Sequence, residues 1–234
     1  MWTASRIPGT FAAEEIHLWA WPLLFDGQDM SAHREILDGR ERERMQRFHF
    51  AADADRYAIV HANVRRILAP YINQPAEKIA FRTGPFGKPE LAGDTSLKFS
   101  LSHSHTTALL AVDPELPLGV DVEDLKPIEP EVADKHFSAT ELSMLRGLQG
   151  DEWLTGFYRC WTRKEAILKA EGVGLSRDLD SFDISLLPDQ KAELVSTRQH
   201  FSYWWALHDV SLSPHIIGAL AAARSQAQIV RFHL

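Results

Sequence analysis

The chain has 234 residues, 45% of them hydrophobic, and a formal net charge of −7. A chain of this size and composition forms a core without disulfides or a structural metal, and its single cysteine, Cys160, excludes an internal disulfide. The acidic balance argues against a broad nucleic-acid-binding face. The N-terminal residues lack a secretion signal, and the longest apolar run, residues 216–223, is too short to span a bilayer. We therefore expect a cytoplasmic protein that binds neither nucleic acid nor membranes.

The first part of the chain alternates between strand and helix patterns. Residues 16–21 alternate as in a β-strand, which Pro22 ends. Apolar residues recur at helical spacing in residues 31–68 and predict two helices, the second closed by Pro70. A turn-rich loop follows at residues 84–89. Strand-like runs then occupy residues 97–102, 107–112 and 118–122.

The turn at residues 113–115 predicts two halves, residues 1–114 and 115–234. In the second half, Ser138 and Glu141 predict a capping box, and residues 151–171 have the strongest helical pattern. Further strand-like runs occupy residues 181–186, 201–208 and 215–222. Strands and helices in mixed order favour an α+β fold over a regular βαβ array, and no repeat is evident by eye.

The run from Gly119 to Glu123 places two carboxylates on a predicted strand. Alternate side chains share a face, so Asp121 and Glu123 project together while Val120 and Val122 face the core. Neighbouring carboxylates repel unless a cation or solvent lies between them. Taken alone, this pattern is more typical of a solvated strand face than of a metal site.

A third carboxylate lies on the long predicted helix. Trp161, Glu165 and Lys169 are one turn apart on one face, a pattern that an exposed Glu–Lys pair also explains. Together, Asp121, Glu123 and Glu165 could supply three oxygen ligands to a hard cation such as Mg²⁺. No cysteine or histidine set has zinc spacing. We expect Lys169 to contact a phosphate group of the substrate.

Further candidate phosphate contacts lie upstream. His103 follows Ser102 on a predicted strand, and we expect it to donate a hydrogen bond to a phosphate oxygen. His103 and His105 share a strand face, but no third nitrogen or sulfur ligand accompanies them. Lys88 is a cation on the rigid loop between Gly87 and Pro89. Arg44, Arg47 and Arg56 add positive charge near the first helices, although solvated helix surfaces explain these arginines equally well.

Several of these segments resemble the motifs of one enzyme family. The runs at residues 119–123 and 161–169 are similar to the two signature motifs of the Sfp-type 4′-phosphopantetheinyl transferases. Four supporting matches, in the family's order, occur at residues 87–89, 99–104, 137–141 and 172–176. The resemblance extends from about Arg42 to Phe182.

This resemblance implies a monomer of two similar α+β halves related by a pseudo-twofold axis, with coenzyme A and Mg²⁺ in the cleft between them. The implied metal ligands are Asp121, Glu123 and Glu165. The implied coenzyme A contacts are Lys169 and His103 at the pyrophosphate, Lys88 and Ser102 along the nucleotide, and Arg44 and Arg56 near the 3′-phosphate. The region around Phe137 would help to receive an apo acyl or peptidyl carrier protein.

The implied reaction moves the phosphopantetheine arm of coenzyme A to a carrier serine. Glu165 would act as the general base, while Lys169 and His103 would stabilise negative charge. Fatty-acid, polyketide, peptide and lysine-pathway carriers are all compatible with the motifs. Two departures from the family pattern are Ser100, where many members have asparagine, and Glu41, where some have lysine.

Two other functions use the same residues. A Mg²⁺-dependent phosphohydrolase would activate water with the same carboxylates and would need no carrier protein. A carrier-binding protein with a degenerate site would bind coenzyme A without any dependence on metal.

Overall fold

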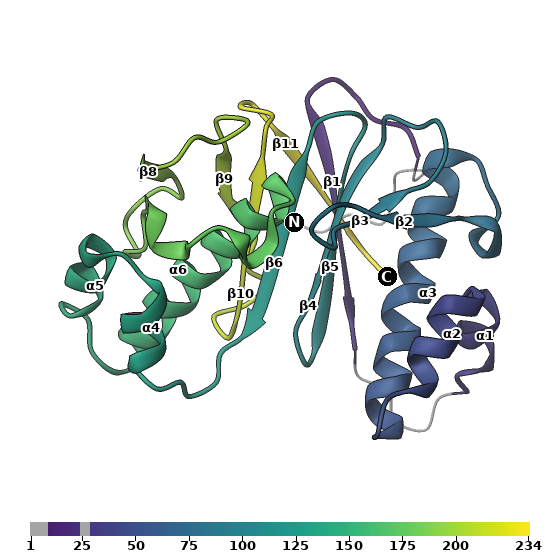
Figure 1. The fold of residues 1–234 in the computed structure, drawn as a ribbon, viewed down its shortest axis with the longest axis horizontal. Coiled ribbons are helices and arrows are strands. Elements are labelled where there is room, and N and C mark those ends of the chain that lie inside the picture. Colours follow the sequence, from purple (N-terminus) through teal and green to yellow (C-terminus); the bar gives the residue numbers. More distant parts are fainter. Residues whose placement is uncertain (1–8, 24–28) are drawn as a thin grey trace.

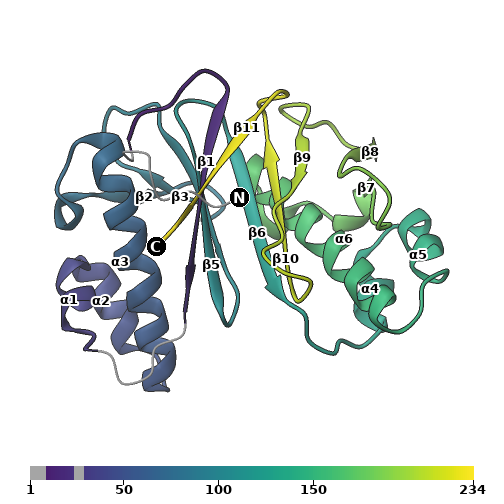
Figure 2. The ribbon, with the colours of Figure 1, turned by 180° about the vertical axis from the view of Figure 1, so that it is seen from behind.

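The computed structural model describes residues 9–23 and 29–234 and has four layers. Two β-sheets lie face to face in the centre, and one long helix covers the outer face of each (Figures 1 and 2). This arrangement is α+β, as the sequence predicts. Within the described residues, no helix is long and apolar enough to cross a membrane.

The first sheet has the strand order β11-β1-β5-β4, and the second has the order β6-β10-β9. The strands of the first sheet are β1 (Glu15–Pro22), β4 (Lys98–His103), β5 (Thr107–Asp113) and β11 (Gln228–His233). Those of the second are β6 (Leu118–Asp124), β9 (Ala206–Asp209) and β10 (Ile216–Ala222). Two small hairpins pair β2 (Phe81–Thr83) with β3 (Pro89–Leu91) and β7 (Phe182–Ile184) with β8 (Leu194–Thr197). The predicted strand at residues 201–208 is therefore too long, because only its last three residues lie in β9.

Three helices precede the first hairpin, where the sequence predicts two: α1 (Ser31–Ile36), α2 (Gly39–Gln46) and α3 (Ala51–Ile72). The prediction that Pro70 closes α3 is wrong, because Pro70 lies inside the last turn of this helix. Proline lacks a backbone N–H donor, and in the last turn this removes only one helical hydrogen bond. The helix ends at Asn73, which has a left-handed conformation with a φ of 50°.

The second half contains α4 (Glu131–His136), α5 (Ala139–Leu145) and α6 (Gly150–Glu171). The predicted capping box is confirmed, because Ser138 and Glu141 each accept a hydrogen bond from the other's backbone amide. Gly172, with a φ of 72°, ends α6 as predicted.

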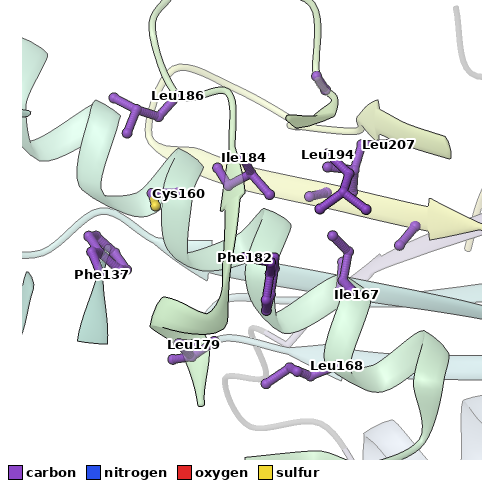
Figure 3. Close-up of a cluster of buried hydrophobic side chains, with 14 of the residues drawn as sticks. Phe137, Cys160, Ile167, Leu168, Leu179, Phe182, Ile184, Leu186, Leu194 and Leu207 are labelled. Carbon is purple, nitrogen blue, oxygen red and sulfur yellow. The ribbon is translucent and has the colours of Figure 1, made fainter. Parts of the chain in front are cut away.

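Alternating side chains build the core between these layers. Ile16, Leu18 and Ala20 of β1 pack against Leu118, Val120 and Val122 of β6 between the two sheets. The opposite face of the second sheet packs against α6 in a cluster that includes Ile167, Leu168 and Leu207, and Figure 3 shows Ile167 beside Phe182. The opposite face of β1 packs against α3. Each sheet is thus buried on both faces.

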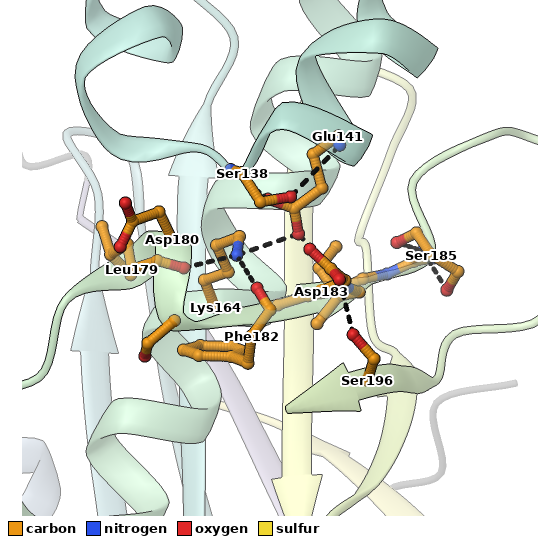
Figure 4. A network of polar contacts seen from close by, with 12 residues as sticks. Ser138, Glu141, Lys164, Leu179, Asp180, Phe182, Asp183, Ser185 and Ser196 are labelled. Carbon is orange, nitrogen blue, oxygen red and sulfur yellow. Dashed lines mark hydrogen bonds and ion pairs between the residues drawn. The ribbon is translucent and has the colours of Figure 1, made fainter. Parts of the chain in front are cut away.

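The two halves share a buried motif that we did not recognise in the sequence. Glu141, in the capping box of α5, forms an ion pair with Lys164 of α6 at 2.9 Å, and both side chains are fully buried (Figure 4). Glu41, in the capping box of α2, forms the equivalent pair with Arg65 of α3 at 2.7 Å. These two clusters occupy corresponding places beside the two long helices.

The last strand connects the two halves. β11 lies after the predicted boundary at residue 114 but pairs in parallel with β1. Arg224, between β10 and β11, binds the carboxylate of Asp113 with two nitrogen atoms at 3.0 and 3.2 Å, and it also contacts Glu14 at 3.1 Å. These contacts hold the returning chain against the end of β5.

Candidate active site

Asp121 lies at the centre of the candidate site, where β4, β6 and α6 meet. Its Oδ1 atom accepts hydrogen bonds from Ser102 Oγ of β4 at 2.8 Å and from Lys169 Nζ of α6 at 2.7 Å. Lys169 also donates to Ser102 Oγ at 2.8 Å. The structure therefore brings together three of the predicted residues, which are separated by as many as 67 positions along the chain.

Gly119 allows α6 to approach β6 closely. A Cβ atom at this position would lie only 2.1 Å from the carbonyl oxygen of Ala166 and 2.3 Å from the amide nitrogen of Ala170. Any larger residue would therefore push the helix away from the strand. The glycine of the 119–123 run is thus what places the Glu165–Lys169 turn beside Asp121.

Two serines of β4 connect the first sheet to the second. Ser100 Oγ accepts a hydrogen bond from the amide of Val120 at 3.0 Å, and Ser102 Oγ accepts one from the amide of Val122 at 3.4 Å. Ser100, one of the two departures from the family pattern, thus makes a local hydrogen bond across the junction of the sheets.

Glu123 and Glu165 flank Asp121 from β6 and α6. Burial, followed by the charge of Asp121, raises the pKa of Glu123 to about 7. The same two causes raise the pKa of Glu165 above its usual range. Asp121 Oδ2 is buried and has no hydrogen-bond partner among the described residues. The site thus concentrates negative charge that the protein itself neutralises only in part, through Lys169.

His103 lies at the end of β4 among basic groups. Burial of His103 lowers its pKa, and the positive charges of His61, Lys169 and Arg56 lower it further. A hydrogen bond at the Ser104 backbone acts in the opposite direction but does not cancel these effects. His103 is therefore mostly neutral near pH 7 and can donate or accept a hydrogen bond. His61 of α3 was not predicted from the sequence, because only the fold brings α3 close to β4.

Two family models match adjacent parts of the chain. The model described as "4′-phosphopantetheinyl transferase superfamily" matches residues 117–222, and the one described as "4′-phosphopantetheinyl transferase, N-terminal" matches residues 26–115. The chain is 31% identical over 219 residues to 4′-phosphopantetheinyl transferase HetI of Nostoc sp.. The aligned region covers 92% of this chain and 90% of the relative. The chain belongs to the 4′-phosphopantetheinyl transferase superfamily.

Other relatives of this transferase come from distant organisms. The 4′-phosphopantetheinyl transferase Sfp of Bacillus subtilis is 35% identical over 165 residues, or 70% of this chain and 73% of the relative. The human L-aminoadipate-semialdehyde dehydrogenase-phosphopantetheinyl transferase is 34% identical over 168 residues, or 65% of this chain and 53% of the relative.

The oxygen donors of the transferase fit a magnesium ion. Among the described residues, no three His, Cys, Asp or Glu side chains are grouped closely enough to form a complete metal-binding set. Mg²⁺ usually takes only one or two protein carboxylates and fills its other positions with water and phosphate oxygens. Asp121 Oδ2 has no partner among the described residues, and burial together with the charge of Asp121 raises the pKa values of Glu123 and Glu165, so an added positive charge would stabilise all three carboxylates.

Lys88 of the transferase lies in the loop between β2 and β3. Its Nζ atom donates to the carbonyl oxygens of Leu118 at 3.0 Å and Ala170 at 3.4 Å. Burial lowers its pKa to about 8. Lys88 also lines a hollow of about 260 Å³ that reaches Glu165 and Lys169. This hollow connects the predicted nucleotide contact to the carboxylate site.

The predicted arginines differ in position. Arg56 lies close enough to His103 to affect its pKa, and its Nη1 donates to Asp53 at 2.7 Å. Arg44 is exposed on α2, and no contact joins it to the carboxylate site within the described residues. Glu41, the other departure from the family pattern, forms an ion pair with Arg65. Its carboxylate therefore has a structural role.

Proposed function

We propose that this transferase moves the 4′-phosphopantetheine arm of coenzyme A to a serine of an apo acyl or peptidyl carrier protein, releases 3′,5′-ADP and requires Mg²⁺. The observation that carries the proposal is the convergence of Asp121, Ser102 and Lys169 at the junction of the two sheets, with Glu123 and Glu165 beside them. Family membership supports the same reaction.

Asp121, Glu123 and Glu165 would hold the metal ion after movements that bring their oxygens together, since the described side chains do not already form a three-ligand set, and the ion would supply positive charge at the pyrophosphate. Glu165 would take the proton from the carrier serine as the serine oxygen attacks the β-phosphorus. The bond from the β-phosphorus to the bridging oxygen then breaks, and that oxygen leaves with the electron pair as part of 3′,5′-ADP.

Basic residues would bind and stabilise the negative groups of the substrate. Lys169 and His103 would contact the pyrophosphate, where charge develops during transfer. Lys88 and Ser102 would lie along the nucleotide. Arg56, and Arg44 after side-chain movement, would approach the 3′-phosphate. We propose that coenzyme A lies in the cleft between residues 1–114 and 115–234.

The carrier protein would approach from the side of α4 and α5. Phe137 itself is buried against Phe157, with ring centroids 5.2 Å apart, so exposed residues around it must make the contact. The relatives' names include an L-aminoadipate-semialdehyde dehydrogenase-phosphopantetheinyl transferase, so carriers of that kind belong in the test set. We propose that the enzyme acts as a monomer.

Intact-mass spectrometry of an apo carrier protein tests this function. The carrier, incubated with enzyme, coenzyme A and Mg²⁺, should gain the mass of the phosphopantetheine arm, and chelation of the metal should prevent the gain. Glu165→Gln should lower the transfer rate by orders of magnitude. Glu152→Gln makes the same change at an exposed position of the same helix and should have no effect.

Release of 3′,5′-ADP without a carrier would instead indicate a phosphohydrolase. No mass gain on fatty-acid, polyketide or peptide carriers, together with coenzyme A binding that ignores Mg²⁺, would indicate a degenerate site. A wild-type rate in Glu165→Gln would contradict the assignment of the general base.

A further inference from the structure

A second hollow lies on the side of α6 that faces away from the candidate active site. This rear hollow, of about 490 Å³, is lined by residues of α6, of the loop before β8, of β9 and of β11. Figure 2 shows the ribbon of these elements from behind. Its polar lining residues include Arg159, Arg163, Lys191, His208, Asp209 and Arg231. None of them takes part in the proposed transfer reaction.

The position of the arginines on α6 separates the rear hollow from the transferase site. Arg159 and Arg163 are four residues apart and share one helix face. Arg163 and Glu165 are two residues apart, so they point in directions that differ by about 200° around the helix axis. A ligand bound to Arg163 in the rear hollow would therefore lie on the opposite side of α6 from Glu165.

The rear hollow concentrates positive charge in an acidic protein. Four cationic side chains line it, with Asp209 as the one carboxylate, although the chain as a whole carries a net charge of −7. Asp209 is about half exposed, and its Oδ2 lies 3.7 Å from Arg163 Nη2, too far for a strong hydrogen bond. The carboxylate thus neutralises the cluster only in part.

Buried polar atoms in the lining lack partners. Arg163 is only 3% exposed, and its Nη1 donates to Ser185 O at 2.7 Å, but its Nε atom has no partner among the described residues. Burial lowers the pKa of Arg163 to about 10, so the guanidinium stays charged at neutral pH. His208 Nε2 is likewise buried and unpartnered within the same part of the structure. The Nε of Arg163 is a donor that a shift of this side chain towards the hollow would pair with a bound acceptor, whereas His208 Nε2 donates only in the tautomer that carries its proton there.

We propose that the rear hollow binds a phosphate-bearing small molecule through Arg159, Arg163 and Lys191. Guanidinium groups match the geometry of phosphate oxygens with two parallel hydrogen bonds, and lysine adds a mobile point charge. The volume exceeds that of one phosphate group, so a phosphate ester fits as well as free phosphate. Because Arg231 of β11 also lines the hollow, the ligand would help to hold β11 against the second half.

The test follows the side-chain Nε–Hε signals of Arg159 and Arg163 by NMR on the full ¹⁵N-labelled chain. Inorganic phosphate is titrated in one series and glycerol 3-phosphate in another. Both signals should move and reach saturation in the wild type. The Arg159→Gln/Lys191→Gln variant changes only residues at the rim, and its Arg163 signal should show affinity reduced at least about tenfold, because charge-assisted hydrogen bonds are lost.

The matched control is Lys78→Gln/Arg146→Gln, which changes the net charge equally at exposed positions outside the hollow. It should bind phosphate as the wild type does. The backbone spectrum shows that each variant is folded. If glycerol 3-phosphate binds more tightly than inorganic phosphate, the site is assigned to a phosphate ester. If the two affinities are equal, the site is assigned to free phosphate. Failure of the arginine signals to saturate, or equal weakening in both double variants, would overturn the proposal.

Discussion

The same face of two equivalent strands has opposite chemistry in the two halves. On β1, His17, Trp19 and Trp21 face α3, and all are at least 95% buried. On β6, the corresponding alternate positions facing α6 are Gly119, Asp121 and Glu123. The other faces of both strands are apolar and pack together between the sheets.

The aromatic side chains of β1 fill the space between the strand and α3, whereas the carboxylates of β6 lack a full set of hydrogen-bond and charge partners. Trp19 stacks on Phe232 with ring centroids 4.4 Å apart, and its Nε1 donates to Tyr71 at 2.9 Å. Asp121, in contrast, keeps a buried oxygen without a partner, and two glutamates beside it have raised pKa values. One scaffold therefore fills this layer with packed aromatic rings in one half and with the candidate active site in the other.

The largest effect should come from the polar face. Asp121→Asn should reduce the transfer rate by about 10²–10³-fold, as expected when one preorganised electrostatic group is lost. The free energy of unfolding should change by less than about 1 kcal/mol, because the lost ion pair involves a partly exposed lysine and carboxylate repulsion is relieved. Steady-state kinetics and urea denaturation measure the two quantities. A large loss of stability would mean that β6 is a structural strand like β1.

The reverse result is expected on the aromatic face. Trp19→Ala should lower the free energy of unfolding by about 3–5 kcal/mol, because it removes a large buried ring and leaves a cavity. Transfer per folded molecule should stay near the wild-type value. Urea denaturation, with activity measured well below the unfolding transition, tests both statements. A transfer rate that fell as steeply as in Asp121→Asn would contradict the division of roles.

The two buried ion pairs sharpen the comparison. Lys164 has Glu141 as its carboxylate partner, whereas Arg65 binds both Glu41 and Asp38, each at 2.7 Å. Glu141→Gln should therefore cost about 3–5 kcal/mol of unfolding free energy, since it leaves a buried charge uncompensated. Glu41→Gln should cost only about 1–3 kcal/mol, because Asp38 remains. Thermal and urea denaturation compare them, with the exposed Glu77→Gln as control, and equal losses would show that Asp38 contributes little.

The smallest effect concerns pH. The pKa of Lys88 is depressed from 10.5 to about 8, so above that value the folded protein holds a neutral amine. Coenzyme A affinity should fall as the pH rises through about 8, by up to about tenfold per pH unit. Between about 8 and 10.5 the unfolded chain binds more protons at this residue, so its contribution to the free energy of unfolding should increase with pH.

Isothermal titration at several pH values measures the affinity, and denaturation over the same range measures the stability. Lys88→Met should bind coenzyme A more weakly at neutral pH and should lack both pH dependences. If the variant kept the pH profile of the wild type, the titrating group would lie elsewhere.

Local signals in the sequence predicted much of the fold. The capping box of Ser138 and Glu141, the length of α6 and the strands β4 to β6 all depend on residues close together in the chain. The pairing of β11 with β1 was not predicted, because strand partners far apart leave no mark in local periodicity. The repeat was missed because Asp38 and Arg65 in one half replace Ser138 and Lys164 in the other, so the geometry is retained while the residue types change.

In the candidate site, too, local spacing was predictable from the sequence and contacts between distant segments were not. Spacing placed Glu165 and Lys169 on one helix face and Asp121 and Glu123 on one strand face. It could not show that Lys169 contacts Asp121 directly, nor that His61 lies near His103, since those relations depend on how α6 and α3 pack on the sheets. The assignments of metal ligand and general base are still predictions for the experiments above.

The pairing of β11 with β1 has a consequence for synthesis in the cell. β1 leaves the ribosome early, but its parallel partner begins at Gln228. At a synthesis rate of about 5–20 residues per second, one edge of β1 waits on the order of 10 s or longer for its partner. During that interval the edge offers unpaired backbone groups to other chains. Chaperone dependence and early aggregation should therefore be governed by β1, whose partner is synthesised more than 200 residues later.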